Sequence, residues 1–235
     1  AWANFFHDNN FLVGLSIDGT PELHDLYRKD PHGQGTYQRI CTSLSTLTAC
    51  NVEVNLLCVV TKQCARKPQH VYREMKKFLI PYMQFIPCLE PLDAQRGDAV
   101  YALSPEQYGR FLCGLFDLWY QDWKNGKYVS IRLFDDYIHV MIGQPSGSCA
   151  TSGQCGSYIV VESNGSFYPC DFYVTDEWCM GNIDTCTIAE ALGSDTAQRF
   201  LSERKKIPGE CAKCRWFPIC RGGCKRDWQV MNGQP

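Results

Sequence analysis

Seven cysteines in the C-terminal part of the chain follow one another at short, unequal intervals. They read Cys149-x5-Cys155, then Cys155-x9-Gly165-x4-Cys170, and finally Cys211-x2-Cys214-x5-Cys220-x3-Cys224. Thiolates at such spacing converge on one centre, and soft sulfur ligands select zinc or iron–sulfur clusters over hard cations, which prefer oxygen. Because this part of the chain is loop-rich and has little core, we expect metal to hold it together.

The other cysteines and the net charge narrow the class of protein. The chain has 235 residues, 15 cysteines and a net charge of -2. Cys41, Cys58 and Cys113 stand in apolar periodic segments, where we expect small buried side chains rather than disulfides. No secretory signal opens the chain, so a reducing cytoplasm is expected. There is no basic footprint for nucleic acid and no apolar run near the ~20 residues of a membrane span.

The first ~145 residues alternate between the strand and helix periods of an α/β fold. Residues 11–17 form an apolar run typical of a strand buried on both faces. A helix over 36–50 and a strand over 52–60 complete one βαβ unit, which predicts a parallel sheet. A helix over 69–79 and a strand over 82–86 follow.

A capping signal marks the start of the next helix. Ser104 stands at the N-cap, Pro105 in the first turn and Gln107 where it completes a capping box, and Asn125-Gly126 ends the helix. Its apolar stripe predicts core packing, with a ligand wall as the alternative. The stripe consists of Tyr108, Phe111, Leu112, Leu115, Phe116, Trp119, Tyr120 and Trp123.

The composition changes after Gln144-Pro145-Ser146-Gly147 and becomes rich in cysteine, glycine and aromatic residues. An Asn164-Gly165 turn predicts a hairpin that joins residues 158–161 to 167–168. One helix is expected near 188–201. We therefore expect two domains, residues 1–146 and 147–235.

Structural zinc is the simplest alternative for the cysteines, but it usually takes two C-x2-C knuckles, and only Cys211 and Cys214 have that spacing. The seven-cysteine order resembles the SPASM domain of radical S-adenosylmethionine enzymes. The resemblance extends to anaerobic sulfatase-maturating enzymes over essentially the whole chain. It is carried by Phe11–Gly19, His24-Asp25, Tyr27-Arg28, Cys155–Glu162, Tyr168–Tyr173 and Gly181-Asn182-Ile183.

The resemblance implies the C-terminal part of a partial (β/α)6 TIM-like radical SAM barrel, followed by a small SPASM iron–sulfur domain that is incomplete at its C-terminus. It implies two auxiliary [4Fe–4S] clusters, the second with a further ligand beyond this sequence. The first would be held by Cys149, Cys155, Cys170 and Cys224, and the second by Cys211, Cys214 and Cys220. The radical-generating C-x3-C-x2-C motif of the family is not in this sequence. We therefore expect a fragment that does not cleave S-adenosylmethionine alone.

Three further residues take roles from the resemblance. Asp171 matches the aspartate that removes the proton from the substrate side chain, a step that needs a base close to the reacting group. The alternative is that Asp171 only caps a turn. Ser16 resembles a position that bonds the methionine part of S-adenosylmethionine, and Arg28 would meet its carboxylate or form a surface salt bridge.

The activity implied is oxidation of a sulfatase cysteine or serine to Cα-formylglycine. The implied partners are an unfolded sulfatase polypeptide or peptide and an electron donor such as flavodoxin or ferredoxin. Another SPASM peptide-modifying enzyme, such as a thioether-forming maturase, and a zinc-binding structural module are the alternatives.

Overall fold

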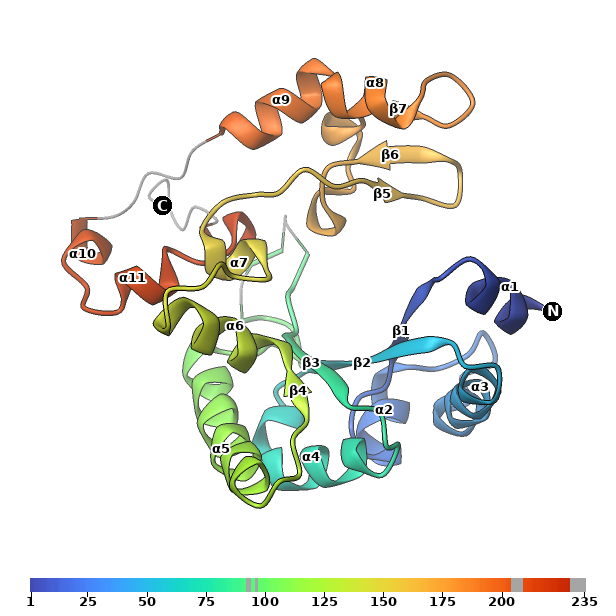
Figure 1. Cartoon of the computed structure of the whole chain (residues 1–235), viewed down its shortest axis with the longest axis vertical. Helices are drawn as coiled ribbons and strands as arrows, with labels where there is room; N and C mark the ends of the chain where they lie inside the picture. The colour runs from blue at the N-terminus through green and yellow to red at the C-terminus, as the bar shows by residue number, and fades with distance from the viewer. Residues whose placement is uncertain (92–93, 96, 204–208, 229–235) are drawn as a thin grey trace. The chain divides into compact units, whose positions relative to one another are not determined.

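The computed structural model describes residues 1–91, 94–95, 97–203 and 209–228 (Figure 1). The chain divides into two compact units, Ala1–Asp135 and Asp136–Pro235. The boundary predicted from composition, between residues 146 and 147, stays a prediction.

The first unit is built on a four-stranded sheet in which each strand pairs with the next one along the chain. Its strands are β1 (Leu12–Ser16), β2 (Glu53–Val60), β3 (Tyr82–Pro87) and β4 (Ser130–Ile131). All three pairings are parallel, as predicted. Sequential parallel order is the strand order of a (β/α) barrel rather than of a doubly wound sheet.

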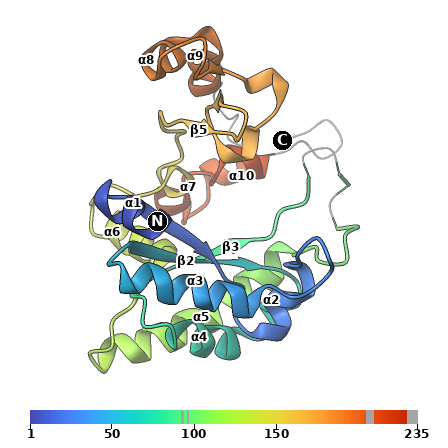
Figure 2. The same ribbon diagram turned by 90° about the vertical axis from the view of Figure 1, so that its right-hand side faces the viewer.

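Helices α2 to α5 lie along one face of this sheet (Figures 1 and 2). The helical elements of the first unit are α1 (Trp2–Asp8), α2 (Pro21–Tyr27), α3 (Tyr37–Ala49), the 3-10 turn η1 (Cys64–Arg66), α4 (Pro68–Lys76) and α5 (Pro105–Lys124); α6 (Arg132–Met141) follows β4. Helices on one face only are again the arrangement of a barrel wall.

The hydrophobic core lies between the sheet and these helices. Along β2 every second residue is buried, as expected for one covered face. The prediction that residues 11–17 are buried on both faces is wrong, because Phe11 is 46% and Leu12 64% exposed. Side chains that are fully buried include Ile17, Leu56, Val60, Val71, Met75, Met83, Phe111, Leu115 and Ile131.

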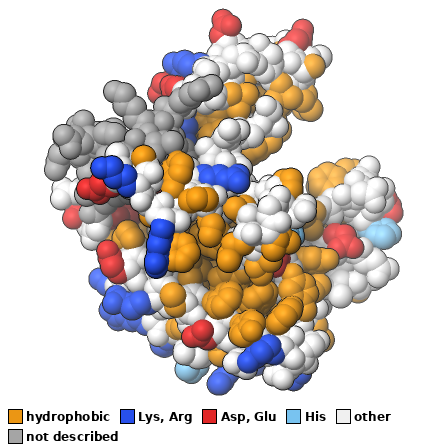
Figure 3. All heavy atoms as spheres, turned by 60° about the vertical axis from the view of Figure 1, so that its left-hand side comes forward, with side chains coloured by type: hydrophobic (Ala, Val, Ile, Leu, Met, Phe, Trp, Pro, Cys, Tyr) orange, Lys and Arg blue, Asp and Glu red, His pale blue; other side chains and the backbone are white. Residues whose placement is uncertain are grey.

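Helix α5 starts with the predicted capping box, in which Ser104 and Gln107 exchange side-chain to backbone bonds. Only part of its apolar stripe is core. Phe116 and Tyr120 are each 41% exposed, because each directly follows a buried residue and so points about 100° away around the helix. Trp123, near the helix end, is 52% exposed. Figure 3, which brings this side of the molecule forward, shows a gathering of hydrophobic side chains.

The cysteines predicted to be buried, which lie outside the seven-cysteine pattern, differ in their solvent exposure. Cys58 is buried as expected, and Cys41 is partly buried. Cys113 on α5 is exposed, so the expectation of a buried side chain is wrong there.

The second unit contains a small antiparallel sheet of three short strands, in the order β5 (Val160–Val161), β6 (Ser166–Tyr168) and β7 (Gly181–Asn182). Strands β5 and β6 form the predicted hairpin. Its turn contains Gly165 at φ +82°, a conformation that glycine adopts without steric cost. Short helical elements make up much of the rest: α7 (Cys149–Ser152), η2 (Asp171–Tyr173), η3 (Asp176–Trp178), α10 (Gly209–Ala212), α11 (Phe217–Cys220) and η4 (Lys225–Trp228).

The single helix expected near 188–201 is two helices, α8 (Ile188–Gly193) and α9 (Asp195–Ser202). Ser194 between them is extended, with ψ 153°, and its hydroxyl accepts from the backbone N–H of Ala197. A serine that caps a new helix competes with continuation of the old one, which explains the break. In the part of the chain that the structure describes, no helix is long and apolar enough to cross a membrane.

Candidate iron–sulfur site and cofactor-binding loop

Four of the seven cysteines lie close enough to two tyrosines of the second unit to affect the pKa values of their hydroxyl groups. Burial raises the pKa of Tyr158, and its hydrogen bond to Cys170 and the charges of Cys170, Asp171 and Cys149 raise it further. Burial also raises the pKa of Tyr173 to about 12, with added contributions from the Cys224, Cys155 and Cys170 thiolates. The cysteines that the resemblance assigns to the first cluster are therefore neighbours in space.

Cys170, at the end of the β5–β6 hairpin, is the buried member of this group, at 7% exposure. Its thiol donates to Oδ1 of Asp171 over 3.4 Å. The Tyr158 hydroxyl lies 3.3 Å from the Cys170 sulfur and 3.2 Å from the same Asp171 oxygen. Burial raises the pKa of Cys170 to about 11, the direction expected for a thiol in apolar surroundings.

Asp171 is exposed at the start of η2, with its carboxylate held by these two contacts. It is therefore both reachable and oriented, as a base must be. Sequence reasoning missed Tyr158. The signal was available, since a tyrosine in a cysteine-rich loop needs a partner for its hydroxyl when partly buried.

Gly153 brings the first cysteine segment against the last one. It ends α7 at φ +71°, and a Cβ built on it would lie 2.7 Å from both Cβ and the carbonyl oxygen of Arg221. Helix α7 begins at Cys149, and Arg221 stands between Cys220 and Cys224. The glycine therefore permits the close backbone approach that brings these cysteines into one region.

Cys211, Cys214 and Cys220 lie along α10, the following turn and α11. The backbone N–H of Cys214 bonds to the carbonyl of Cys211 at 3.1 Å, which folds the C-x2-C segment into one turn. Cys214 and Cys220 are exposed. Burial raises the pKa of Tyr137, and the nearby charge of Cys220 raises it further.

Sulfur is the common donor of both groups, so they fit a soft metal or an iron–sulfur cluster better than a hard cation. No three His, Cys, Asp or Glu side chains within residues 1–91, 94–95, 97–203 and 209–228 are arranged so that they could hold a metal ion. One observation supports the cluster: Cys149, Cys155, Cys170 and Cys224 each lie close enough to Tyr158 or Tyr173 to raise the pKa of its hydroxyl.

Ser16 is the last residue of β1 and is partly buried at the carboxyl end of the sheet. Parallel α/β proteins bind ligands at this end of their strands. Arg28, the other predicted cofactor contact, pairs with Asp18 instead: its Nε donates to Oδ2 at 2.6 Å and its terminal nitrogen to Oδ1 at 3.3 Å. The salt bridge was one of the two predicted alternatives.

Asp18 also accepts from the backbone N–H of Val59 at 2.8 Å, which ties the loop after β1 to β2. Its own N–H donates to Nδ1 of buried His24 at 3.2 Å. His24 Nε2 faces the Thr36 hydroxyl at 3.0 Å, and that hydroxyl donates to the carbonyl of Arg28. His24 is therefore the neutral Nε2–H tautomer, and burial lowers its pKa. The network fixes the loop next to Ser16.

Comparison with known proteins agrees with this arrangement. Residues 149–215 match the SPASM family model, described as an iron–sulfur cluster-binding domain. A parallel α/β unit with helices along one face, followed by this domain, is the fold class predicted from the resemblance to radical SAM proteins with a SPASM domain.

The individual relatives narrow the family. The chain is 43% identical over 226 residues to a cysteine-type anaerobic sulfatase-maturating enzyme of Clostridium novyi, covering 96% of this chain and 60% of that protein. A serine-type enzyme of Bacteroides thetaiotaomicron is 32% identical over 251 residues, covering 100% of the chain and 60% of that protein. The structure of native anSMEcpe with bound AdoMet and Kp18Cys peptide matches with a TM-score of 0.90 at 43% identity, covering 98% of this chain and 64% of that one.

The chain is thus similar to the anaerobic sulfatase-maturating enzymes over nearly all of its length, which confirms the predicted resemblance and fold class. It spans about 60% of the length of the curated relatives it matches.

Proposed function

We propose that this chain contributes the substrate base, an auxiliary cluster and part of the cofactor site to a radical SAM oxidation of a sulfatase cysteine or serine to Cα-formylglycine. The observation that carries the proposal is the contact of Asp171 with Cys170 and Tyr158, at 3.4 and 3.2 Å. A carboxylate beside the Cys170 thiol, on a chain whose relatives are named as sulfatase-maturating enzymes, supports this role.

Cys149, Cys155, Cys170 and Cys224 would hold one [4Fe–4S] cluster, and Cys211, Cys214 and Cys220 would contribute to a second. S-adenosylmethionine, which is bound in a relative's structure, would after one-electron reductive cleavage supply the carbon radical that takes hydrogen from Cβ of the substrate residue. Asp171 would accept the proton that the substrate thiol or hydroxyl loses as the C=S or C=O bond forms; from cysteine, water then hydrolyses the C=S group to the aldehyde and sulfide leaves. Substrate oxidation releases a second electron as well, and the auxiliary clusters are the candidates to receive it.

The remaining roles concern binding. Ser16 would contact the methionine part of the cofactor from the carboxyl end of β1. Arg28 would act through Asp18, by holding the loop that follows Ser16, rather than by meeting the cofactor carboxylate. A sulfatase peptide as substrate is supported by the peptide in the matched structure, and a small electron-transfer protein as donor rests on the family resemblance.

Metal and sulfide analysis tests the cluster assignment. After anaerobic reconstitution, Cys170→Ala should lose about four iron and four sulfide relative to the wild type, the content of one cluster. Cys179→Ala, in the same unit but outside the assigned set, should lose none. Stoichiometric zinc without sulfide in the wild type would instead establish a zinc-binding structural module.

Asp171→Asn tests the base in the complete protein that contains this sequence. The amide keeps the size of the side chain but cannot take a proton, so formylglycine formation should fall ~10²–10⁴-fold, the usual contribution of a positioned base. Cofactor cleavage should fall less, and iron content should be unchanged. Near-normal maturation of a sulfatase peptide would exclude Asp171 as the base, and iron loss in proportion to activity would make it a support of the cluster loop.

A further inference from the structure

Lys225, the residue directly after Cys224, has its ammonium enclosed by three aromatic rings of the second unit. Its Nζ lies 4.4 Å from the ring centroid of Phe200, 4.9 Å from that of Trp178 and 5.5 Å from that of Tyr173. The three rings pack against one another edge to face at 5.2–6.0 Å. The Lys225 side chain is only 13% exposed. Its positive charge is therefore fixed and partly removed from water.

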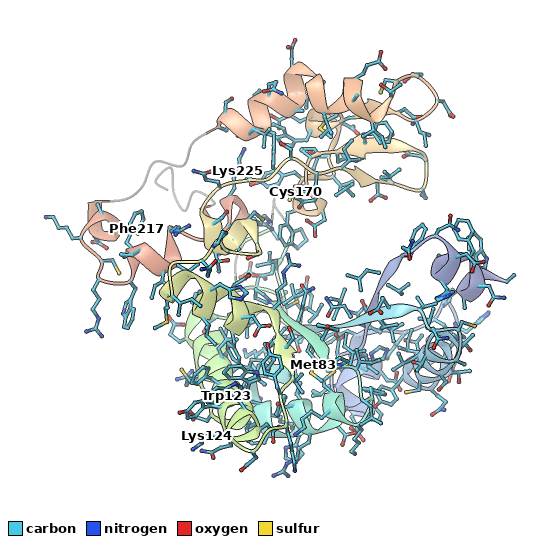
Figure 4. The ribbon with its side chains drawn as sticks, in the orientation of Figure 1. Met83, Trp123, Lys124, Cys170, Phe217 and Lys225 are labelled. Carbon is cyan, nitrogen blue, oxygen red and sulfur yellow. The ribbon has the colours of Figure 1, made fainter. Side chains whose placement is uncertain are left out.

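The rings of Tyr173, Trp178 and Phe200, here called the aromatic cage, lie next to cysteines assigned to the proposed first cluster. Cys170 and Cys155 pack in the same hydrophobic cluster as Tyr173, Trp178 and Phe200. The Tyr173 ring, one wall of the cage, is also the ring that senses the charges of Cys155, Cys170 and Cys224. Lys225 and three of the four assigned thiols thus share one aromatic neighbour. Figure 4 labels Lys225 and Cys170 within the second unit.

Other charges around the cage do not cancel this effect. Lys225 Nζ pairs with the carboxylate of Glu203 and lies 3.5 Å from the carbonyl oxygen of Phe200. The Glu203 side chain is 46% exposed, so water screens its charge more than that of the ammonium. Arg199 lies 4.4 Å from the Trp178 ring and pairs with the exposed Glu177 carboxylate at 3.5 Å, so these two charges largely offset each other. Of these four charges the Lys225 ammonium is the least exposed, at 13%, so water screens it least.

We propose that Lys225 raises the reduction potential of the auxiliary cluster held by Cys149, Cys155, Cys170 and Cys224. Reduction adds one negative charge to a cluster whose four thiolates already carry charge, and a fixed neighbouring cation stabilises the reduced form. The inference deepens the proposed function, on whose ligand assignment it rests. It assigns Lys225 a tuning role: the cluster becomes a better acceptor for the electron that leaves the substrate.

A redox titration of the reconstituted protein, followed by electron paramagnetic resonance, tests this role. It uses a Cys214→Ala background to remove the second cluster. Lys225→Met keeps the length and apolar contacts of the side chain but removes its charge. It should lower the reduction equilibrium constant on the order of tenfold, which is about 59 mV for one electron. Lys225→Arg restores a cation and should bring the potential back towards the wild type.

Two further variants complete the test: one should shift the reduction potential in the opposite direction, and the other is a control. Glu203→Gln removes the compensating carboxylate and should raise the potential. Lys124→Met removes a cation–aromatic contact to Tyr120, 5.0 Å long, on exposed α5, and should change nothing. Because a midpoint potential belongs to each loaded cluster, it can be measured even when a variant holds less iron.

The outcomes separate the two proposals. Zinc without sulfide in the wild type overturns the cluster assignment itself. Loaded clusters with the same potential in wild type, Lys225→Met and Glu203→Gln overturn only the tuning role. If Lys225→Met holds no cluster, the result for Glu203→Gln decides, since an unchanged potential there refutes the proposal.

Discussion

Replacing Gly153 by alanine should selectively disrupt the site where the two cysteine segments meet. Gly153 adopts φ +71°, a left-handed conformation that costs an alanine ~1–2 kcal/mol. The new Cβ would also lie 2.7 Å from Cβ and from the carbonyl oxygen of Arg221, so backbone rather than a flexible side-chain end must move. Overpacking of this kind adds ~1–3 kcal/mol. We therefore expect a loss of about 2–5 kcal/mol in the free energy of unfolding of the second unit.

Gly156 provides the matched control three positions later. A Cβ at Gly156 would meet nothing within 4 Å, and its φ is not positive. Gly156→Ala should therefore stay within about 0.5 kcal/mol of the wild type. Urea unfolding of both variants, with iron and sulfide analysis of the reconstituted proteins, gives the comparison. Because α7 carries Cys149, Gly153→Ala should also lose iron. Equal stability and equal metal content in the two variants would refute the close approach of α7 to Arg221.

Three other perturbations test separate parts of the structure. His24 is buried, and burial lowers its pKa below the unfolded value of ~6.5. Below pH ~6.5 the native state therefore binds fewer protons than the unfolded state. The free energy of unfolding is at its full value above that pH and falls below it, by at most ~1.4 kcal/mol per pH unit. In urea unfolding at pH 7 and 5.5, His24→Gln should lose this part of the pH dependence, and an unchanged slope would contradict the buried neutral imidazole. Thr187→Ala removes the N-cap of α8 and should lower the free energy of unfolding by about 1 kcal/mol, measured by thermal unfolding. Thr175→Ala, at the N-cap of η3 where the side chain makes no capping bond, should lower it clearly less. Equal losses in the two variants would count against the capping box. Tyr158→Phe removes a hydrogen bond to the Asp171 carboxylate and should slow formylglycine formation in the complete protein about tenfold with iron content unchanged, while a full rate would show that Asp171 needs no such partner.

The sequence by itself determined the elements whose signals are local. The capping box at Ser104 and Gln107, the Asn164-Gly165 hairpin and the alternation of strands and helices depend on neighbours only a few residues apart, and the structure contains all of them. The cysteine spacing predicted a metal-binding framework for the same reason, since each short interval limits how far two thiols can separate; the resemblance of that spacing to the SPASM pattern then predicted the iron–sulfur domain.

Only the tertiary structure decided which surfaces are covered and which charges meet. Phe116 and Tyr120 continue an apolar stripe, yet their exposure depends on how wide a face of α5 is packed. Ser194 breaks a helix because its hydroxyl caps α9. The contacts of Asp18 with Val59, and of Lys225 with the rings of Trp178 and Phe200, join segments that lie far apart in sequence, and no local pattern encodes them. Such pairs form because the fold brings distant segments together, after which burial strengthens the interaction of the charges it encloses.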